Sequence, residues 1–210
     1  MTASIIILAK VPTPGRVKTR LAADIGKVKA TKVHARLFRH TLEKALDTGL
    51  PVTVALDGDM TDDWAHRLQK NGVTIERQCD GDLGQRLKHA MRSPGRHIAL
   101  GSDCVLFEPE WLLDAARSEW PVVIGPAEDG GYWSITVDNT VPNIRDILFD
   151  HMPWSEPSLL KETLQKLRGK HLEPVLLPLA YDVDTLADLQ RLMRDTGCPD
   201  ALQKDLSDLF

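Results

Sequence analysis

Short apolar runs alternate along this chain with stretches whose apolar residues recur every three or four positions. Five runs have the length and composition of buried strands: 4–9, 52–56, 73–78, 97–101 and 121–126. Amphipathic helices are predicted between them, at 29–47, 62–71, 83–92 and 109–118. Strand, helix and strand in repeated succession predict an α/β fold with a mostly parallel central sheet.

The last third of the chain has a different pattern. The predicted elements are an alternating, antiparallel strand at 132–137, a helix at about 156–168, an apolar stretch at 172–179 and a final helix ending near Gly197. Asp184 or Thr185 is a plausible cap for that final helix. Because no low-complexity linker and no internal repeat interrupts the 210 residues, we expect one domain, 1–210, with an appended C-terminal part.

Composition excludes several classes of protein. No apolar run approaches the roughly 20 residues that a membrane span needs, and "MTASIIILAK" lacks the basic start of a signal peptide. Cys79, Cys104 and Cys198 form no CxxC pair, so we expect neither a disulfide framework nor a zinc site, and a reducing cytoplasm fits. A net charge of −4 argues against a general nucleic-acid binder.

The stretch "LAKVPTPGRVKTRLA" places positive charge in a proline-broken loop directly after the first predicted strand. Arg16, Lys18 and Arg20 occupy alternate positions there, ahead of a helix. Backbone N–H groups, a helix start and fixed cations are the components of an anion site. The Walker pattern GxxxxGK[ST] is absent. The spacing alone fits a solvated basic turn equally well.

Carboxylates follow the later strands. Asp103, in "LGSDCVLFEPEW", lies just past a strand end, where it would be either a helix cap or a ligand of a hard cation such as Mg²⁺. Asp182 and Asp184 alternate in "YDVDTLADL" and would share one face of an extended chain. Either residue would complete a metal site with Asp103, whereas the structural alternative is that Asp184 only caps the last helix.

Two glycine-containing loops complete the candidates. In "IGPAEDGGYW", two adjacent carboxylates precede two glycines, which permit close approach of the backbone to a ligand but also suit a tight turn. The loop "QCDGDLGQRL" would contact a nucleotide base or sugar, or simply turn the chain.

Six segments in this order resemble one family: "AKVPTPGRVKTRLA", "GDLGQR", "GSDC", "GPAEDGGYW", "PWSEP" and "DVDTLADL". The family is DUF2064, also described as glycosyltransferases associated with radical-SAM and selenodomain proteins, of the arsenosugar-biosynthesis type. It resembles the GT-A superfamily of nucleotide-sugar transferases and is similar to guanylyltransferases that act on phospholactate and molybdopterin. The resemblance implies one GT-A-like three-layer α/β/α domain, with a nucleotide-binding part at about 1–126 and an acceptor part at about 127–210.

The resemblance also implies a role for each matching residue. The residues implied to bind the nucleotide and its phosphates are Lys10, Gly15, Arg16, Lys18, Arg20 and Gly84. Asp103, with Asp184 as second ligand, would hold Mg²⁺ or Mn²⁺. The residues implied on the acceptor side are the catalytic candidates Asp129 and Glu128, with Gly130, Gly131 and Tyr132. Val105 stands where the family usually has proline, so we expect a looser loop after Asp103.

These residues predict a metal-dependent glycosyltransferase that moves a sugar from a nucleotide-sugar to a small acceptor, with Asp129 as the first candidate to take the acceptor proton. The alternative is a nucleotidyltransferase of the guanylyltransferase type, which would use a nucleoside triphosphate and release pyrophosphate. A further alternative is a non-catalytic module that binds a nucleotide or a sugar. None of the three requires nucleic acid or a membrane span.

Overall fold

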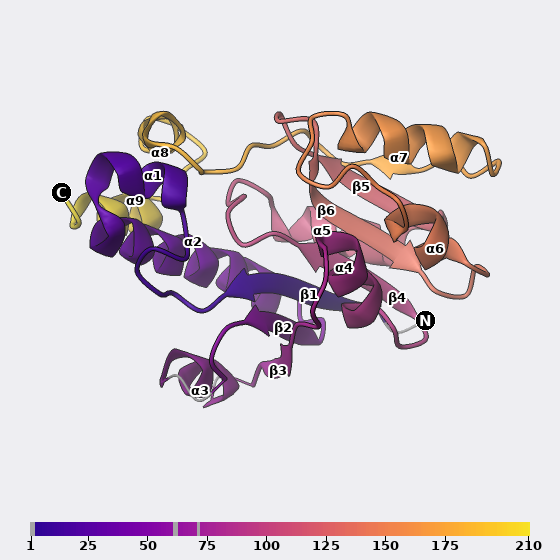
Figure 1. Cartoon of the computed structure of the whole chain (residues 1–210), viewed down its shortest axis with the longest axis horizontal. Helices are drawn as coiled ribbons and strands as arrows, with labels where there is room; N and C mark the ends of the chain where they lie inside the picture. Colours follow the sequence, from indigo (N-terminus) through magenta and orange to yellow (C-terminus); the bar gives the residue numbers. More distant parts are fainter. Residues whose placement is uncertain (1–2, 61–62, 71) are drawn as a thin grey trace.

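The computed structural model describes residues 3–60, 63–70 and 72–210. Its centre is a seven-stranded sheet in the order β3-β2-β1-β4-β6-β5-β7 (Figure 1). The strands are β1 (Ala3–Lys10), β2 (Val52–Asp57), β3 (Thr74–Arg77), β4 (Arg96–Leu100), β5 (Val122–Pro126), β6 (Tyr132–Asp138) and β7 (Val175–Leu176).

Strand direction brings the polar loops to one edge of the sheet. β1 pairs in parallel with β2 and β4, and β2 with β3, whereas β6 runs antiparallel between β4 and β5. The β1–β2 register ends with Lys10 opposite Asp57. The carboxyl ends of β1 to β5 therefore share an edge, which is where open α/β sheets bind ligands.

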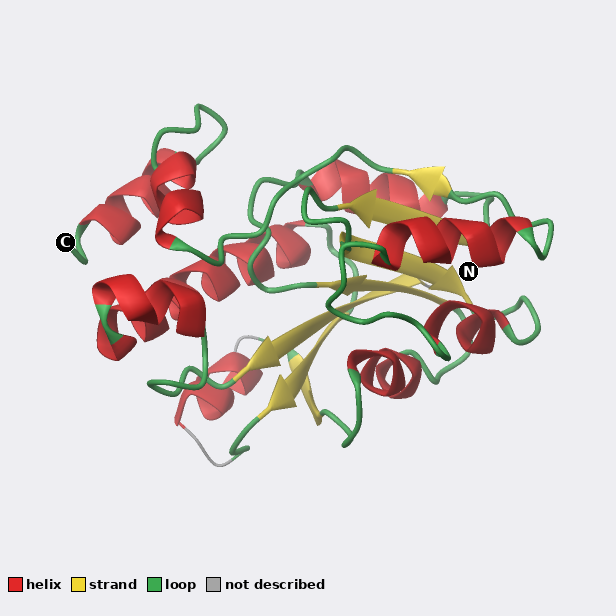
Figure 2. Cartoon of the chain, turned by 45° about the horizontal axis from the view of Figure 1, so that its top comes forward, coloured by secondary structure: helices red, strands yellow, loops and turns green. Residues whose placement is uncertain are grey.

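Helices cover both faces of the sheet, as Figure 2 shows. One face packs on α2 (Lys27–Asp47), α3 (Asp63–Lys70) and α5 (Pro109–Arg117) through one apolar cluster. The other face packs on α4 (Leu83–Ala90), α6 (Ile144–Phe149) and α7 (Leu159–Arg168) through a second cluster. Strand side chains alternate between the two clusters, as Ile5 and Ile6 do. The predicted three-layer α/β/α fold is confirmed.

A third apolar cluster lies beyond the end of the sheet. It joins α1 (Thr19–Ile25), the first half of α2, α8 (Leu186–Leu192) and α9 (Asp200–Ser207). Val105, from the loop after β4, and Val183, ahead of α8, are buried in the same cluster. The C-terminal segment thereby returns to the carboxyl ends of the first strands.

Most predicted elements are present, and the differences lie in short helices. Helix α2 begins at Lys27 rather than residue 29, and the predicted helix 62–71 is α3, whose predicted ends at 62 and 71 lie outside the described residues. The final predicted helix ends at Leu192 instead of near Gly197, and Thr185, not Asp184, is its cap. Helices α1, α6 and α9 were not predicted, because each has only six to eight residues and begins without a side-chain cap.

Candidate functional site

A cleft of about 640 Å³ opens at the carboxyl edge of the sheet. Its charged lining consists of Lys10, Arg16, Lys18, Arg20, Arg86, Asp57, Asp103 and Asp184. Five cations face three carboxylates, so the lining has two positive charges in excess although the whole chain has a net charge of −4. A concave surface with this balance concentrates anions.

The loop between β1 and α1 forms the cationic side of the cleft. A turn, in which the Arg16 backbone N–H donates to the Thr13 carbonyl, reverses the chain, and Gly15 has φ +84°. Val17 is buried, and Arg16, Val17 and Lys18 all line the cleft. Lys10, Arg16 and Arg20 form no ion pair within residues 3–60, 63–70 and 72–210. Their charges therefore remain available to a ligand.

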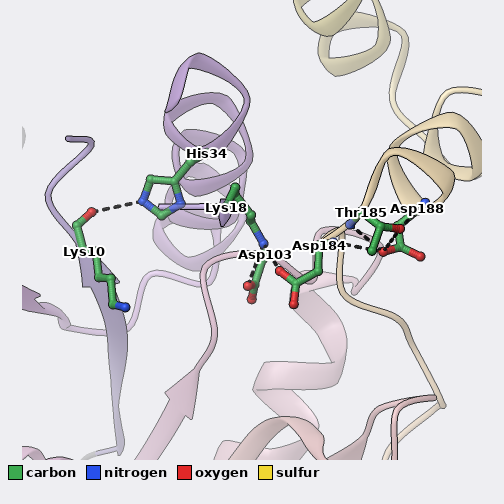
Figure 3. A network of polar contacts seen from close by, with 7 residues as sticks. All are labelled: Lys10, Lys18, His34, Asp103, Asp184, Thr185 and Asp188. Carbon is green, nitrogen blue, oxygen red and sulfur yellow. Dashed lines mark hydrogen bonds and ion pairs between the residues drawn. The ribbon is translucent and has the colours of Figure 1, made fainter. Parts of the chain in front are cut away.

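Lys18 holds together the two carboxylates that the sequence suggested as metal ligands. Its Nζ lies 2.8 Å from Asp103 Oδ2 and 2.7 Å from Asp184 Oδ1, and its side chain is only 4% exposed (Figure 3). The three residues come from the loops after β1 and β4 and from the segment before α8. Lys18, one of the predicted phosphate-binding residues, is therefore in direct contact with both predicted metal-binding residues.

Backbone contacts bring Asp184 to Asp103. The Val183 N–H donates to the Asp103 carbonyl at 3.2 Å, which places the next side chain at the cleft. One oxygen of Asp188 then accepts from the backbone N–H groups of Asp184 and Thr185, at 3.1 and 2.8 Å. This capping box fixes the start of α8, so the Asp184 carboxylate is left free for Lys18.

Burial and pairing act in opposite directions on the Lys18–Asp103 pair. Burial alone would raise the pKa of Asp103, but the charge of Lys18 and its hydrogen bond hold that pKa below its ordinary value. Burial alone would lower the pKa of Lys18, but Asp103 and Asp184 raise it above its ordinary value. The pair is ionised at neutral pH.

His34, which was not predicted as a site residue, lines the cleft behind Lys18. Its Nε2 lies 3.0 Å from the Lys10 carbonyl at the end of β1. Burial lowers the pKa of His34, and the Lys10 carbonyl opposes this only in part, so the ring is neutral and Nε2–H is the donor. The only signal in the sequence was a histidine within the apolar stripe of α2.

Lys44 secures the loop that follows Asp103. Its buried ammonium donates to the carbonyls of Val105, at 3.4 Å, and Phe107, and lies 3.4 Å from the Glu108 carboxylate. Its Nζ also lies 5.4 Å from the centre of the Phe107 ring. Val105 itself is buried in the third apolar cluster. The loop that we expected to be looser without proline is thus held by α2 and by burial.

The opposite wall of the cleft is a hydrogen-bonded network that was not predicted. Arg86 Nη1 donates to Asp57 Oδ2 and Gln78 Oε1, both at 2.9 Å. Gln78 Nε2 donates to the carbonyls of Ala9 and Ala55, at 3.2 and 2.8 Å, which fixes its amide. This wall joins the ends of β1, β2 and β3, so its polar atoms are held in place before a ligand arrives.

The loop 127–131 contains the two predicted catalytic carboxylates, which differ in their surroundings. Glu128 receives two hydrogen bonds from the Arg191 guanidinium, at 2.6 and 2.7 Å, and these bonds lower its pKa. Among the described residues, Asp129 accepts only the backbone N–H of Gly131, through Oδ1 at 2.9 Å. Glu128 is therefore occupied by a cation of α8, whereas Asp129 keeps an oxygen for other contacts.

Asp182 lies among the acidic residues of the site. Burial raises its pKa to about 8, and the neighbouring charges of Asp103 and Asp129 add to the effect. Asp129 itself is not among the residues that line the cleft.

The remaining predicted residues have packing roles. A Cβ on Gly84 would lie 2.4 Å from the Phe149 carbonyl oxygen, so this glycine allows α4 to pack closely, and Gly81 and Leu83 line the cleft instead. Gly130 has φ +90°, and a Cβ there would lie 2.1 Å from the Pro157 carbonyl oxygen. The Tyr132 ring packs against Trp154 and the second apolar cluster.

Within the described part of the chain, no group of three or more His, Cys, Asp or Glu side chains is arranged to hold a metal ion. Asp103 and Asp184 are nevertheless close enough to share one cation, since both bind the same ammonium. Carboxylate pairs of this kind hold Mg²⁺ when phosphate oxygens and water supply the other ligands.

Residues 41–156 match the family described as "Uncharacterized protein conserved in bacteria (DUF2064)". The chain belongs to this family. The match covers more than half of the 210 residues and includes the Asp103 loop and both predicted catalytic carboxylates. The resemblance inferred from the sequence motifs is therefore confirmed.

Solved structures extend the likeness over the whole DUF2064 chain. A "putative nucleotide-diphospho-sugar transferase" from Desulfovibrio desulfuricans G20 has 28% identity and a TM-score of 0.85, over 100% of this chain and 97% of its own. The inositol-1-phosphate CTP transferase from T. maritima has 15% identity and a TM-score of 0.63, over 99% and 96%.

A third solved structure, 4-diphosphocytidyl-2C-methyl-D-erythritolsynthase from Anaerococcus prevotii DSM 20548, has 11% identity and a TM-score of 0.59, over 90% of this chain and 95% of its own. At such identities the two cytidylyl-type enzymes show a shared fold alone. No curated protein matches the chain. Across residues 3–60, 63–70 and 72–210, no helix is both long and apolar enough to cross a membrane.

Proposed function

We propose that this DUF2064 protein is a metal-dependent transferase that moves a sugar from a nucleotide-sugar to a small acceptor. The observation that carries the proposal is the cleft, which is lined by Lys10, Arg16 and Arg20, without an ion pair in the described part of the chain, and by the carboxylates of Asp103 and Asp184. The similarity to a protein described as a nucleotide-diphospho-sugar transferase supports the same class.

The cationic loop is suited to the diphosphate of such a donor. Lys10, Arg16 and Arg20 line the cleft beyond β1 and form no ion pair among the described residues, and Lys18 lines the same cleft and binds Asp103 and Asp184. Charge-assisted hydrogen bonds from these groups would stabilise the negative charge that develops on the departing nucleoside diphosphate. The excess of two positive charges in the cleft matches the two negative charges of a diphosphate ester.

Asp103 and Asp184 are the residues that would hold a divalent metal. Their hard oxygen atoms converge on one point, now taken by the Lys18 ammonium. A bound Mg²⁺ or Mn²⁺ would supply further neutralisation of the diphosphate. The donor set of two carboxylates fits Mg²⁺ and Mn²⁺ because substrate phosphates commonly complete such sites.

Asp129 is our candidate for the group that takes a proton from the acceptor. Its Oδ2 has no hydrogen bond among the described residues, and the charge of Asp129 acts on Asp182 in the acidic group beside the cleft. Glu128 is less suited to this role, because Arg191 occupies both of its oxygens. Its ion pair instead fixes the loop that contains Asp129 to helix α8.

A second candidate function is transfer of a nucleotidyl group from a nucleoside triphosphate. The fold is shared with cytidylyl-type enzymes over at least 95% of their chains, and the cationic loop would serve a triphosphate equally well. That reaction needs no proton acceptor, because a phosphate nucleophile is already ionised.

Product analysis distinguishes the candidates. The protein would be incubated with Mn²⁺ and either a panel of nucleotide-sugars or a panel of nucleoside triphosphates, together with mixed small metabolites as acceptors. Release of nucleoside diphosphate is the expected result. Release of pyrophosphate would establish the second candidate instead, and tight binding without turnover in either panel would indicate a binding module.

Asp129→Asn tests the proton acceptor. We expect kcat to fall by about 10²–10⁴-fold while donor affinity changes little, because a general base acts in the transition state. Glu128→Gln is the matched control, with the same loss of charge at the adjacent residue, and should lose far less turnover. Equal losses of kcat and donor affinity in Asp129→Asn would make Asp129 a binding residue.

A further inference from the structure

The ammonium of Lys18 occupies the point at which the Asp103 and Asp184 carboxylates converge (Figure 3). Distances of 2.8 and 2.7 Å leave no room for a second cation between the same two oxygens. The site in this state is a closed group of three charges, one positive and two negative, with the cation buried.

We propose that Lys18 is a placeholder cation that makes the metal and the nucleotide bind as a single chelate. In the ligand-free protein, its ammonium neutralises the carboxylate pair. Asp103 and Asp184 would hold a divalent metal that is bound to a nucleoside diphosphate or triphosphate, and the Lys18 ammonium would exchange their oxygens for a phosphate oxygen. This inference rests on the proposed function, and it identifies the ligand as the metal–nucleotide complex, not the free metal.

The number of protein ligands supports this exchange. Only two carboxylates bind Lys18, and no larger metal-binding group exists in the part of the chain that the structure describes. A metal ion arriving alone would have to displace the ammonium and strand it in a cleft with other cations. A phosphate-bound metal supplies both additional ligands for the metal and an acceptor for Lys18.

The position of Lys18 in the chain makes the exchange feasible. Its Nζ ends a stem of four methylenes, and it lines the same cleft as Lys10, Arg16 and Arg20, where an anion would bind. Its backbone has φ 45° and ψ 51°, the left-handed conformation, at the N-cap of α1. Such a backbone conformation is strained for a non-glycine residue and is concentrated at functional sites.

In the described part of the chain, four other non-glycine residues have positive φ values, and none of the four lines the cleft. The strained lysine is thus the one that contacts both candidate metal ligands. If Lys18 exchanged its carboxylate partners for a phosphate, metal binding and nucleotide binding would be coupled. The phosphate would accept the Lys18 ammonium, and the two carboxylates would become available to the metal.

Lys88 offers a matched control within the same protein. Its Nζ also binds two carboxylates, Asp146 at 2.6 Å and Asp150 at 2.9 Å, but its side chain is 33% exposed and it does not line the cleft. A lysine that binds two carboxylates is therefore present both in the cleft and away from it. Only the former should influence metal binding.

Equilibrium dialysis of Mn²⁺ against wild-type protein, Lys18→Met, Lys18→Arg and Lys88→Met tests the proposal, with and without inorganic pyrophosphate as the phosphate probe. Wild type, Lys18→Arg and Lys88→Met should retain Mn²⁺ weakly alone and at least tenfold more tightly with pyrophosphate. Lys18→Met should bind Mn²⁺ alone at least tenfold more tightly than wild type, and pyrophosphate should add much less.

Equal affinity of wild type and Lys18→Met for Mn²⁺ alone would overturn the placeholder role and leave the proposed transferase intact. Failure of the wild type to retain Mn²⁺ under either condition would overturn both, because the metal assignment itself would be wrong. If Lys18→Met does not fold, the affinity of the wild type for Mn²⁺ with and without pyrophosphate still tests the proposal. Tight Mn²⁺ binding without pyrophosphate would contradict the proposal, and binding only with pyrophosphate would support it.

Discussion

Two lysines of this protein, Lys18 and Lys88, each bind two carboxylates. Comparing them shows that the same kind of contact has different consequences in different surroundings. Lys18 binds Asp103 and Asp184 at 2.8 and 2.7 Å, and Lys88 binds Asp146 and Asp150 at 2.6 and 2.9 Å. The side chain of Lys18 is 4% exposed, whereas that of Lys88 is 33% exposed. Similar distances therefore occur in very different dielectric surroundings.

The two clusters also differ in what they connect. Lys88 joins α4 to α6, two helices on the same face of the sheet. Lys18 joins three segments that are distant in sequence, at the carboxyl edge of the sheet where the cleft opens. Exposed ion pairs contribute about 0–1 kcal/mol, whereas removing one partner of a buried pair leaves an uncompensated buried charge and is strongly unfavourable. Location, not geometry, makes the Lys18 cluster a candidate site.

The largest expected difference is in nucleotide affinity. Lys18→Met should weaken binding of the best nucleotide by about 1.5–3 kcal/mol, because one charge-assisted phosphate contact is lost. Lys88→Met should change it by less than about 0.5 kcal/mol, as at an ordinary surface position. Isothermal titration with Mn²⁺ present measures both. Equal losses of nucleotide affinity in Lys18→Met and Lys88→Met would contradict the proposed difference between the two lysines.

A smaller effect is expected on stability at Lys44, a buried lysine that binds two backbone carbonyls as well as the Glu108 carboxylate. Lys44→Met should lower the free energy of unfolding by about 1–3 kcal/mol, because the buried carbonyls of Val105 and Phe107 lose their donor. Lys88→Met should cost no more than about 1 kcal/mol. Urea unfolding of the two variants gives these values, and a Lys44→Met loss no larger than that of Lys88→Met would refute the importance of burial.

The smallest effect concerns pH and the histidine one turn before Lys44. Burial lowers the pKa of His40 to about 4, assisted by Lys44 and Arg39 and opposed by the Val105 backbone and Glu108. Since this folded-state value lies below the ordinary 6.5, the unfolded chain takes up the proton first as pH falls. The stabilising contribution of neutral His40 is therefore complete above pH 6.5 and disappears toward pH 4.

His40→Gln tests this linkage. Between pH 7 and 4.5, the wild type should lose about 1–2 kcal/mol more stability than the variant, because glutamine does not titrate. Unfolding by urea at a series of pH values provides the comparison. Parallel curves for the two proteins would show that His40 is not buried in its neutral form.

The sheet and its long helices were predictable because periodicity reports burial directly. The runs that became β1, β2, β4 and β5 are continuous and apolar, as strands covered on both faces must be. The capping residue Asp82 before α4 and Pro109 in the first turn of α5 were also recognisable. Helix α1 was missed because Lys18 occupies its N-cap position and supplies no side-chain cap.

The site was only partly predictable, because its chemistry depends on contacts between distant segments. Lys18, Asp103 and Asp184 were each identified from a strand end or a motif, but nothing in the sequence indicated that one ammonium binds both carboxylates. His34 and Lys44 lie on the buried side of α2. From the sequence, a polar residue at such a position is interpreted as part of the packed core until its hydrogen-bond partners are known. Only the tertiary contacts show which backbone groups His34 and Lys44 bind.

We expect the cleft to bind a metal–nucleotide complex through Asp103. A thermal-shift screen of nucleotide-sugars, nucleoside diphosphates and triphosphates, with and without Mn²⁺, tests it on wild type and Asp103→Asn. At 100 times its Kd, a bound nucleotide adds about 2.7 kcal/mol, or roughly 5–10 °C in Tm for a domain of this size. We predict such a shift in wild type only with Mn²⁺, and its loss in folded Asp103→Asn. An equal Tm shift in both proteins, or no shift with any nucleotide, would contradict the binding of a metal–nucleotide complex through Asp103.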